Sequence, residues 1–177
     1  THVAGTAIGV GRPDGLFQGM APGATLIDQK VLSDAGLGFG SADGVEWAVI
    51  NKEQYNIRVL NLSLGGLDAS DGTDAGSQMM NAAFDAGLLP VIAMGNDGET
   101  NYVSSPAAAT KALAIGSYND QNTIARADDL ISDFSNEGPR ADDGPGDPVG
   151  QTKPLVAAPG SGVLSRAGTP TTATPPS

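Results

Sequence analysis

The sequence predicts a single α/β domain built on a mostly parallel sheet. Segments with the apolar pattern of strands alternate along the chain with segments of helical periodicity, an order typical of parallel sheets. One strand pattern, at residues 58–64, is apolar at nearly every position and indicates a strand buried on both faces. The chain has 177 residues, of which 40% are hydrophobic, enough for one packed domain but short for two.

The first part of the chain carries two predicted helices with a strand between them. Residues 1–10 form a helix of small residues, which we expect to be buried because small side chains allow close approach to a neighbour. Residues 24–32 are expected to form a strand with an apolar body. In the second helix Asp43 is the expected N-cap, and Glu46 completes a capping box. The apolar face of this helix consists of Val45, Trp47, Ala48, Val49 and Ile50.

The second part of the chain continues the alternation and then loses it. Strands are predicted at 58–64, 88–94 and 112–117. A helix is expected at 75–86, and Gly87 ends it. Its inward residues are Met79, Met80, Ala83 and Phe84. Residues 153–160 are expected to be extended and buried, residues 140–151 to form an exposed acidic loop, and the Thr- and Pro-rich residues 169–177 to form a mobile tail.

Composition excludes several kinds of partner and site. The chain has 9 Lys and Arg against 20 Asp and Glu, a formal charge of −11, which makes nucleic acid a poor partner. There is no Cys and only one His, which argues against disulfides, a cysteine nucleophile and a zinc site. No apolar run reaches membrane-spanning length. The acidic loop at 68–74 lacks EF-hand spacing, so we expect a solvated loop and no metal ligands.

Three Gly-rich loops, at 36–40, 65–66 and 95–98, follow three predicted strands and are expected to converge on the sheet edge where ligands bind. Residues 36–40 have the context of a dinucleotide-binding turn, but the third Gly comes one residue early and no acidic residue ends the next strand. Asn96 lies between Gly95 and Gly98, directly after a predicted buried strand. An amide held there can donate a hydrogen bond to a developing oxyanion. On that segment alone, an ordinary turn asparagine is the better interpretation.

Short motifs spread over nearly the whole chain decide between these interpretations. They are Thr1–Thr6, Gly19–Ala24, Gly44–Ala48, Asn61–Gly66, Ala93–Gly98, Phe134–Pro139 and Ala157–Gly160. In this order they resemble the subtilisin-like serine proteases, the subtilases of peptidase family S8. The resemblance implies a three-layer α/β fold, with a mostly parallel sheet flanked by helices, that is incomplete at both ends of this chain.

The resemblance also implies that the catalytic triad lies outside residues 1–177. The catalytic His of the family is the first His of the motif His-Gly-Thr-His-Val-Ala-Gly-Thr, and His2 matches the second one. The catalytic Asp would precede Thr1, and no Gly-Thr-Ser-x-Ala motif for the nucleophile is present. We therefore expect residues 1–177 to be a partial catalytic domain, inactive alone.

The residues carried over from the family are those that bind and polarise the substrate. Asn96 matches the oxyanion-hole asparagine. One wall of the primary specificity pocket is formed by Ser63, Leu64 and Gly65, and the opposite wall by Ala93, Met94 and Gly95. Gly36 and Gly38 match the other substrate-pairing edge, and whether 36–38 or 38–40 pairs is left open. The walls imply an apolar preference, whereas Asp97 at the rim would admit Lys or Arg.

The function implied is that of a secreted serine endopeptidase with an Asp/His/Ser triad and an acyl-enzyme intermediate. Its partners would be polypeptide substrates and its own propeptide, and neither nucleic acid nor membrane. The chemistry requires no cofactor, although the family leaves calcium sites in the full-length protein open. The alternative is a catalytically dead, subtilase-like scaffold that binds peptides. Asn96 argues against this alternative because an oxyanion donor has no use without chemistry.

Overall fold

A computed structural model describes residues 2–38, 40–140 and 152–165, which fall into two compact units. One unit takes Thr1–Asp28 with Gly162–Ser177, and the other takes Gln29–Ser161. Residues 141–151 and the predicted tail at 169–177 lie outside the described residues. Arg140, the first residue of the predicted exposed loop, is buried, so the prediction is wrong at this position.

The smaller unit contains helix α1 (His2–Ile8), as predicted. The segment that follows returns along this helix, and Met20 and Ala21 donate main-chain hydrogen bonds to Thr6 and Ala7, at 3.0 and 2.8 Å. No residue of α1 is buried, which contradicts the expected burial. Small side chains and main-chain contacts hold this unit together, and neither removes much apolar surface from water.

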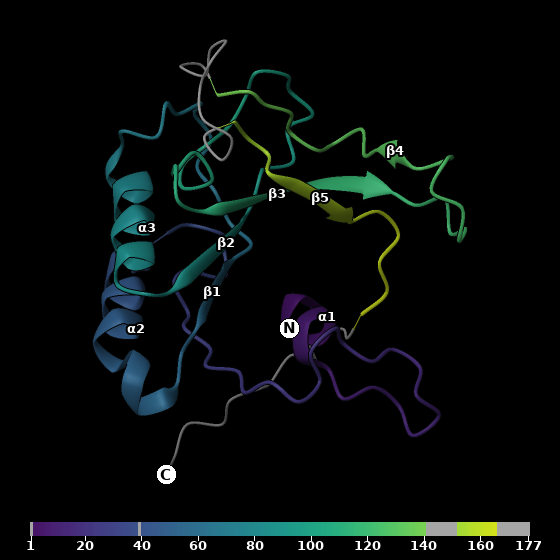
Figure 1. Ribbon diagram of the computed structural model, residues 1–177, viewed down its shortest axis with the longest axis horizontal. Helices are drawn as coiled ribbons and strands as arrows, with labels where there is room; N and C mark the ends of the chain where they lie inside the picture. The colour runs from purple at the N-terminus through teal and green to yellow at the C-terminus, as the bar shows by residue number, and fades with distance from the viewer. Residues whose placement is uncertain (1, 39, 141–151, 166–177) are drawn as a thin grey trace. The chain divides into compact units, whose positions relative to one another are not determined.

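The larger unit contains a five-stranded sheet (Figure 1). Strands β1 (Val59–Leu62), β2 (Leu89–Ala93) and β3 (Leu113–Asn119) are parallel neighbours. Strand β5 (Val156–Pro159) pairs with β3 in parallel, and the two-residue strand β4 (Leu130–Ile131) pairs with it antiparallel. The α/β class, the mostly parallel sheet and the strands predicted at 58–64, 88–94 and 112–117 are therefore confirmed.

One predicted strand is absent, and this changes the environment of its neighbour. Residues 25–31 form no strand, and only Leu32 makes an isolated bridge, to Gly38. Strand β1 is consequently at the edge of the sheet, with Val59 53% exposed and only Leu62 buried. Burial on both faces is therefore wrong for β1, because an apolar strand is covered only where the fold supplies a neighbour.

The segment after residue 152 is extended, as predicted, but not uniformly buried. Lys153 is 1% exposed and donates through Nζ to the carbonyl oxygen of Ala112 at 2.6 Å. Val156 in β5 is 48% exposed. The predicted burial therefore holds for Lys153 and fails within the strand itself.

Helices α2 (Ser41–Tyr55) and α3 (Ala75–Asp85) lie along one face of the sheet (Figure 1). The larger unit thus contains two of the three expected layers: the sheet and this pair of helices. The N-cap of helix α2 is Gly40, which has no side chain that could accept a capping hydrogen bond. Asp43 lies inside the first turn, where its carboxylate still interacts favourably with the positive end of the helix dipole. The predicted Asp43 capping box is therefore wrong.

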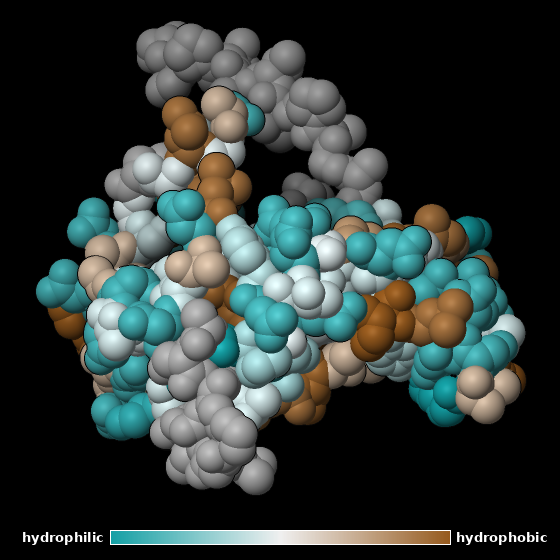
Figure 2. Space-filling model, turned by 90° about the horizontal axis from the view of Figure 1, so that it is seen from above, coloured by the Kyte–Doolittle hydropathy of each residue, from teal (hydrophilic) through white to brown (hydrophobic). Residues whose placement is uncertain are grey.

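The core joins both helices to the sheet and to residues 103–112. Its buried members are Val45, Leu62, Met80, Ala83, Ile92, Met94, Val103, Ala107, Ala108, Ala109, Ala112 and Ala114. The predicted inward residues Trp47, Ile50 and Phe84 are instead exposed by 37, 71 and 43%. On the face shown in Figure 2, hydrophobic residues form small separate groups among hydrophilic ones.

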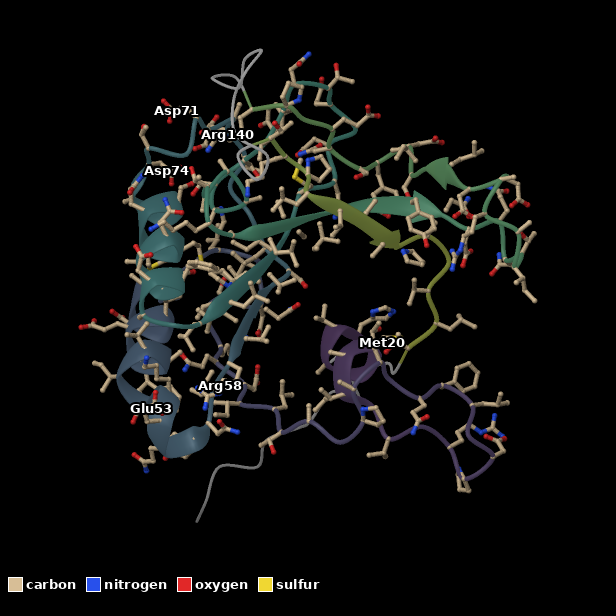
Figure 3. The ribbon with its side chains drawn as sticks, in the orientation of Figure 1. Met20, Glu53, Arg58, Asp71, Asp74 and Arg140 are labelled. Atoms are coloured by element: carbon tan, nitrogen blue, oxygen red, sulfur yellow. The ribbon has the colours of Figure 1, made fainter. Side chains whose placement is uncertain are left out.

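Asp74 is the N-cap of α3 and the centre of a serine network (Figure 3). Its carboxylate accepts hydrogen bonds from the main-chain nitrogen of Ser77 at 2.9 Å and from the hydroxyls of Ser70, Ser77 and Ser105. Partial burial alone would raise the pKa of Asp74, but the hydrogen bonds from Ser105, Ser70 and Ser77 outweigh it. They hold the pKa well below the ordinary value of 3.8.

We expect Asp74→Ala to lower the free energy of unfolding by about 2 kcal/mol at neutral pH, because it removes the cap and leaves its donors unpaired. Asp71→Ala, which removes only local contacts to Thr73, should cost much less. The contribution of Asp74 is present above pH 3.8 and is lost as the pH falls towards the lowered pKa. In urea unfolding the difference between wild type and Asp74→Ala should therefore shrink in acid. A constant difference would show that the ionised carboxylate is not the stabilising group.

Candidate active site

The candidate site lies where two parallel strands end. Strands β1 and β2 are in register, with Asn61 opposite Val91 and Leu62 opposite Ile92. Their carboxyl ends therefore leave the sheet side by side. The two segments that the sequence assigns to opposite walls of a substrate pocket, residues 63–65 and 93–95, follow these ends directly.

The segment after β1 keeps its main chain accessible. Ser63 and Gly65 are exposed, whereas Leu64 is half-buried and packs against the core. The main-chain nitrogen of Gly66 donates to the carbonyl oxygen of Ser105 at 2.7 Å. A Cβ at Gly65 would come within 3.1 Å of the Ser104 hydroxyl, so this close approach favours glycine.

The segment after β2 changes from buried to exposed within three residues. Met94 is 1% exposed, belongs to the core, and donates its main-chain N–H to the carbonyl oxygen of Ile115 at 3.0 Å. Gly95 follows with φ at +105°, in the region that favours glycine. Asn96 is exposed, and its side chain makes no hydrogen bond to the described residues. The chain thus turns sharply at Gly95 and presents the Asn96 amide to solvent.

A buried amide from a distant segment holds this turn. Asn136 is 1% exposed and accepts hydrogen bonds at Oδ1 from the main-chain nitrogens of Asp97 and Glu99, at 2.9 and 3.4 Å. Its Nδ2 donates to the Met94 carbonyl oxygen at 3.3 Å and to Asp97 Oδ2 at 2.9 Å. The exposed amide of Asn96 therefore projects from a main chain that is held on both sides by hydrogen bonds.

The other predicted substrate edge is a tight turn. Ser33 donates through its main-chain nitrogen to the Leu37 carbonyl oxygen at 2.8 Å, and Gly36 to the Ser33 carbonyl oxygen at 2.9 Å. Gly36 has φ at +79°, and Gly38 pairs with Leu32. These hydrogen bonds are internal to the turn, so the structure brings together Asn96 and the two walls but does not tie Gly36 or Gly38 to them.

His2 lies on the exposed surface of α1 in the other unit. Its Nε2 is 3.2 Å from the carbonyl oxygen of Val163. Among the described residues, Ser165 donates its hydroxyl to the main-chain carbonyl oxygen of His2 at 2.9 Å, and no hydroxyl is hydrogen-bonded to the imidazole. The sequence match to the second His of the motif gives His2 no catalytic role.

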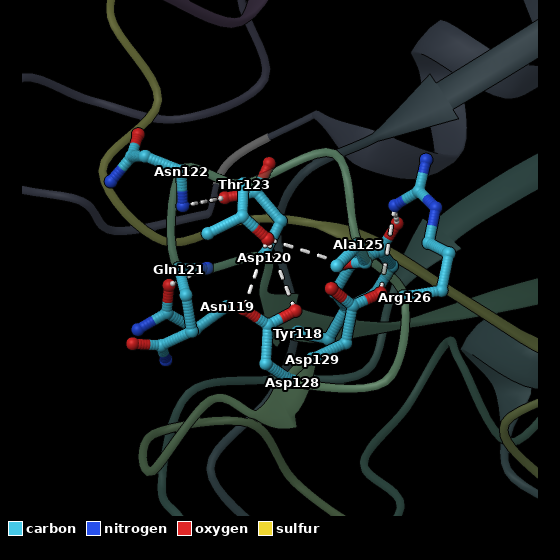
Figure 4. A network of polar contacts seen from close by, with 10 residues as sticks. All are labelled: Tyr118, Asn119, Asp120, Gln121, Asn122, Thr123, Ala125, Arg126, Asp128 and Asp129. Atoms are coloured by element: carbon cyan, nitrogen blue, oxygen red, sulfur yellow. Dashed lines mark hydrogen bonds and ion pairs between the residues drawn. The ribbon is translucent and has the colours of Figure 1, made fainter.

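The acidic loop between β3 and β4 uses its side chains locally (Figure 4). Asn119 and Asp120 accept main-chain hydrogen bonds at 3.0 Å from residues two positions onward, and Thr123 donates to Asp128 at 3.0 Å. Arg126 lies 3.5 Å from Asp129. Within the described residues, no group of three or more His, Cys, Asp or Glu side chains is placed to share a metal ion. No helix in that same part of the chain is long and apolar enough to cross a membrane.

The family model for the subtilase family matches residues 1–176. This chain belongs to the subtilases. It is 33% identical to the serine protease AprX of Bacillus subtilis, a match that covers 93% of this chain and 38% of AprX. It is 36% identical to subtilisin E of the same species over 71% of this chain and 32% of that protein.

Solved structures agree with the sequence comparison. Sphericase superimposes with a TM-score of 0.71 at 28% identity, covering 94% of this subtilase chain and 53% of that chain. A cold-adapted subtilisin-like serine proteinase gives a TM-score of 0.66 at 29% identity, covering 93 and 50%. The subtilisin-like fold is therefore confirmed. The chain spans about a third of the length of AprX and subtilisin E and about half of the two solved chains.

Sequence reasoning missed the role of Asn136 in this subtilase. The residue lies in the motif Phe134–Pro139, which supported the family resemblance but received no function. Its contacts lie 39 residues away along the chain, at Asp97. The one sequence feature that could have indicated this role is the presence of a polar residue, Asn136, in a motif to which no function was assigned.

Proposed function

We propose that the protein carrying this chain is a serine endopeptidase in which Asn96 stabilises the oxyanion of the tetrahedral intermediate. The single observation that carries the proposal is the exposed Asn96 amide, on a fixed turn beside residues 63–65, in a chain of the subtilase family. The nucleophilic serine, the histidine base and the orienting aspartate are proposed to lie outside residues 1–177.

In the proposed reaction the serine oxygen attacks the scissile carbonyl carbon while its proton passes to the histidine. The carbonyl oxygen becomes negatively charged, and Asn96 Nδ2 donates a hydrogen bond to it. Collapse of the intermediate expels the amine, which takes the proton from the histidine, and leaves an acyl-enzyme that water hydrolyses. Asn96 thus acts on charge that develops only after attack, so it accelerates the step without tightening substrate binding equally.

The proposed substrate is a polypeptide that adds a strand beside Ser63, Leu64 and Gly65. The opposite wall consists of Ala93, Met94 and Gly95, and Gly36 and Gly38 are proposed for the second pairing edge. Because the Met94 side chain is in the core, this residue would contribute its main chain. The preference is apolar, or Lys or Arg if Asp97 faces the bound residue.

Further properties are proposed from the family relationship and the acidic composition. The protein is secreted, binds its own propeptide, and has neither nucleic acid nor membrane as a partner. Its chemistry requires no cofactor, and calcium sites in the full-length protein are left open.

The alternative is a subtilase-like relative that binds peptides without catalysis. A fluorophosphonate probe and a fluorogenic peptide, applied to the full-length protein and to residues 1–177, separate the two. We expect labelling and hydrolysis by the full-length protein and neither by residues 1–177. Peptide binding without labelling by the full-length protein would establish the scaffold instead. A burst of acyl-enzyme from residues 1–177 would contradict the proposed location of the triad.

A further inference from the structure

We infer that Asn136 is a positioning residue for the proposed oxyanion donor, because its buried amide fixes the main chain on both sides of Asn96. This inference rests on the proposed function and extends it to a residue that does not touch the substrate. Asn136 and Asn96 share no direct contact among the described hydrogen bonds, so the effect passes through the main chain of residues 94–99.

The amide of Asn136 is fully used by this one turn. A side-chain amide offers two N–H donors and two acceptor sites on its oxygen. Here Oδ1 accepts from Asp97 and Glu99, and Nδ2 donates to the Met94 carbonyl oxygen and to Asp97 Oδ2. The side chain is 1% exposed, so each lost contact would leave a shielded polar group unpaired.

The turn needs an external constraint because its own sequence is flexible. Gly95 and Gly98 flank the Asn96–Asp97 pair, with φ at +105° and +68°. Glycine loses more conformational freedom on folding than any other residue, so a turn bracketed by two glycines is costly to order. Contacts from residues 134–136 supply that order, including main-chain bonds from Asn136 to the Gly95 carbonyl oxygen at 3.2 Å and from Gly98 to the Phe134 carbonyl oxygen at 2.9 Å.

Fixing Asn96 has a catalytic consequence. Its own side chain makes no hydrogen bond to the described residues, so what the turn fixes is the position of the Asn96 main chain and Cβ, from which the amide must reach the oxyanion. An oxyanion donor is effective only when it is already aimed at the place where charge develops, and small displacements are expensive. Asn136 therefore contributes to turnover through Asn96, and to substrate binding hardly at all.

The kinetic test measures Asn136→Leu and Asn136→Asp in the full-length protein on a peptide substrate, each alone and together with Asn96→Ala. Asn136→Leu keeps the approximate size of the side chain and loses all four hydrogen bonds, whereas Asn136→Asp loses both donors and places a second carboxylate against Asp97 Oδ2, which Nδ2 contacts at 2.9 Å. We expect kcat to fall about ten- to a hundredfold for Asn136→Leu and at least as much for Asn136→Asp, with KM nearly unchanged. With Asn96→Ala present, the same changes should lower kcat by less than about twofold.

Ser135→Ala is the matched control. Ser135 is the adjacent residue and is 4% exposed; its hydroxyl accepts a hydrogen bond from the main-chain nitrogen of Ser117 at 2.9 Å and donates to the main-chain carbonyl oxygen of Asn136 at 3.2 Å, but makes no hydrogen bond with residues 94–99. Any effect of this change on kcat should be the same with and without Asn96→Ala. Equal losses from Asn136→Leu in the two backgrounds would overturn the inference while leaving the proposed function intact.

Amide hydrogen exchange provides a readout that does not depend on hydrolysis. Asn136→Leu, or Asn136→Ala if the first variant does not fold, should accelerate exchange at Asp97 and Glu99 about tenfold. Exchange at the Met94 amide, which donates to the carbonyl oxygen of Ile115, should be unchanged in these variants. In Ser135→Ala, exchange at the amides of Met94, Asp97 and Glu99 should all be unchanged. If the wild-type protein hydrolyses no peptide, the proposed function fails. The exchange experiment still tests whether Asn136 holds the main chain of residues 94–99. Unchanged exchange at Asp97 and Glu99 would overturn the inference.

Discussion

Asn96→Ala is expected to lower kcat of the full-length protein about a hundred- to a thousandfold, with KM little changed. This range is known for removing one such donor from a subtilisin, and we carry it over to this relative. The reason for a loss confined to turnover is the proposed role of the amide, which is exposed on a turn whose main chain is held by Asn136 and which would meet charge that the bound substrate does not yet carry. Steady-state kinetics on a peptide substrate gives kcat and KM separately.

Two variants support the interpretation of that experiment. Asn96→Asp preserves the shape of the side chain but has no N–H to donate, so it should be at least as impaired as Asn96→Ala. Thr100→Ala changes another exposed residue of the same loop and should leave kcat near the wild-type value. A rise in KM at constant kcat would mean that Asn96 binds substrate and does not stabilise the oxyanion.

The parts of the fold that could be predicted from the sequence are those set by local pattern. Strands β2 and β3 and helix α3 lie close to their predicted ranges because their apolar residues match the period of the element. The segment at 24–32 has an equally good strand pattern, yet it forms no strand. A strand pattern indicates which side chains of a segment would be buried in a sheet. Whether the segment joins a sheet depends on a neighbouring strand with which it can pair.

The candidate site shows the same division. The positions of residues 63–65 and 93–96 follow from parallel strands that end together, and the sequence order was sufficient to predict this. The role of Asn136 depends on contacts made 39 residues away, which no local pattern contains. The exposed positions of Trp47 and Ile50 likewise depend on how α2 rests against the sheet and not on helical periodicity. The family resemblance therefore identified the proposed donor, and only the structure showed which residue holds its turn.

The second large effect is expected from Gly95→Ala, which should lower the free energy of unfolding by about 3–5 kcal/mol. Gly95 has φ at +105°, where an L-residue is strained, and a Cβ there would lie 2.4 Å from Asn136 Nδ2. Relief of this clash requires the Asn136 amide to leave its position, which breaks its buried hydrogen bonds. The change should also lower kcat, because the turn that aims Asn96 would then shift.

Gly15→Ala separates strain from clash. Gly15 has φ at +79° and nothing within 4 Å of an added Cβ, so this variant experiences backbone strain alone and should cost only about 1–2 kcal/mol. Urea unfolding of the full-length protein measures both variants. If Gly95→Ala costs no more than Gly15→Ala, the packing of Asn136 against the turn is loose, and a residue packed loosely there has no means of aiming Asn96. A larger cost at Gly95 shows that the buried amide of Asn136 packs tightly against the turn that carries Asn96.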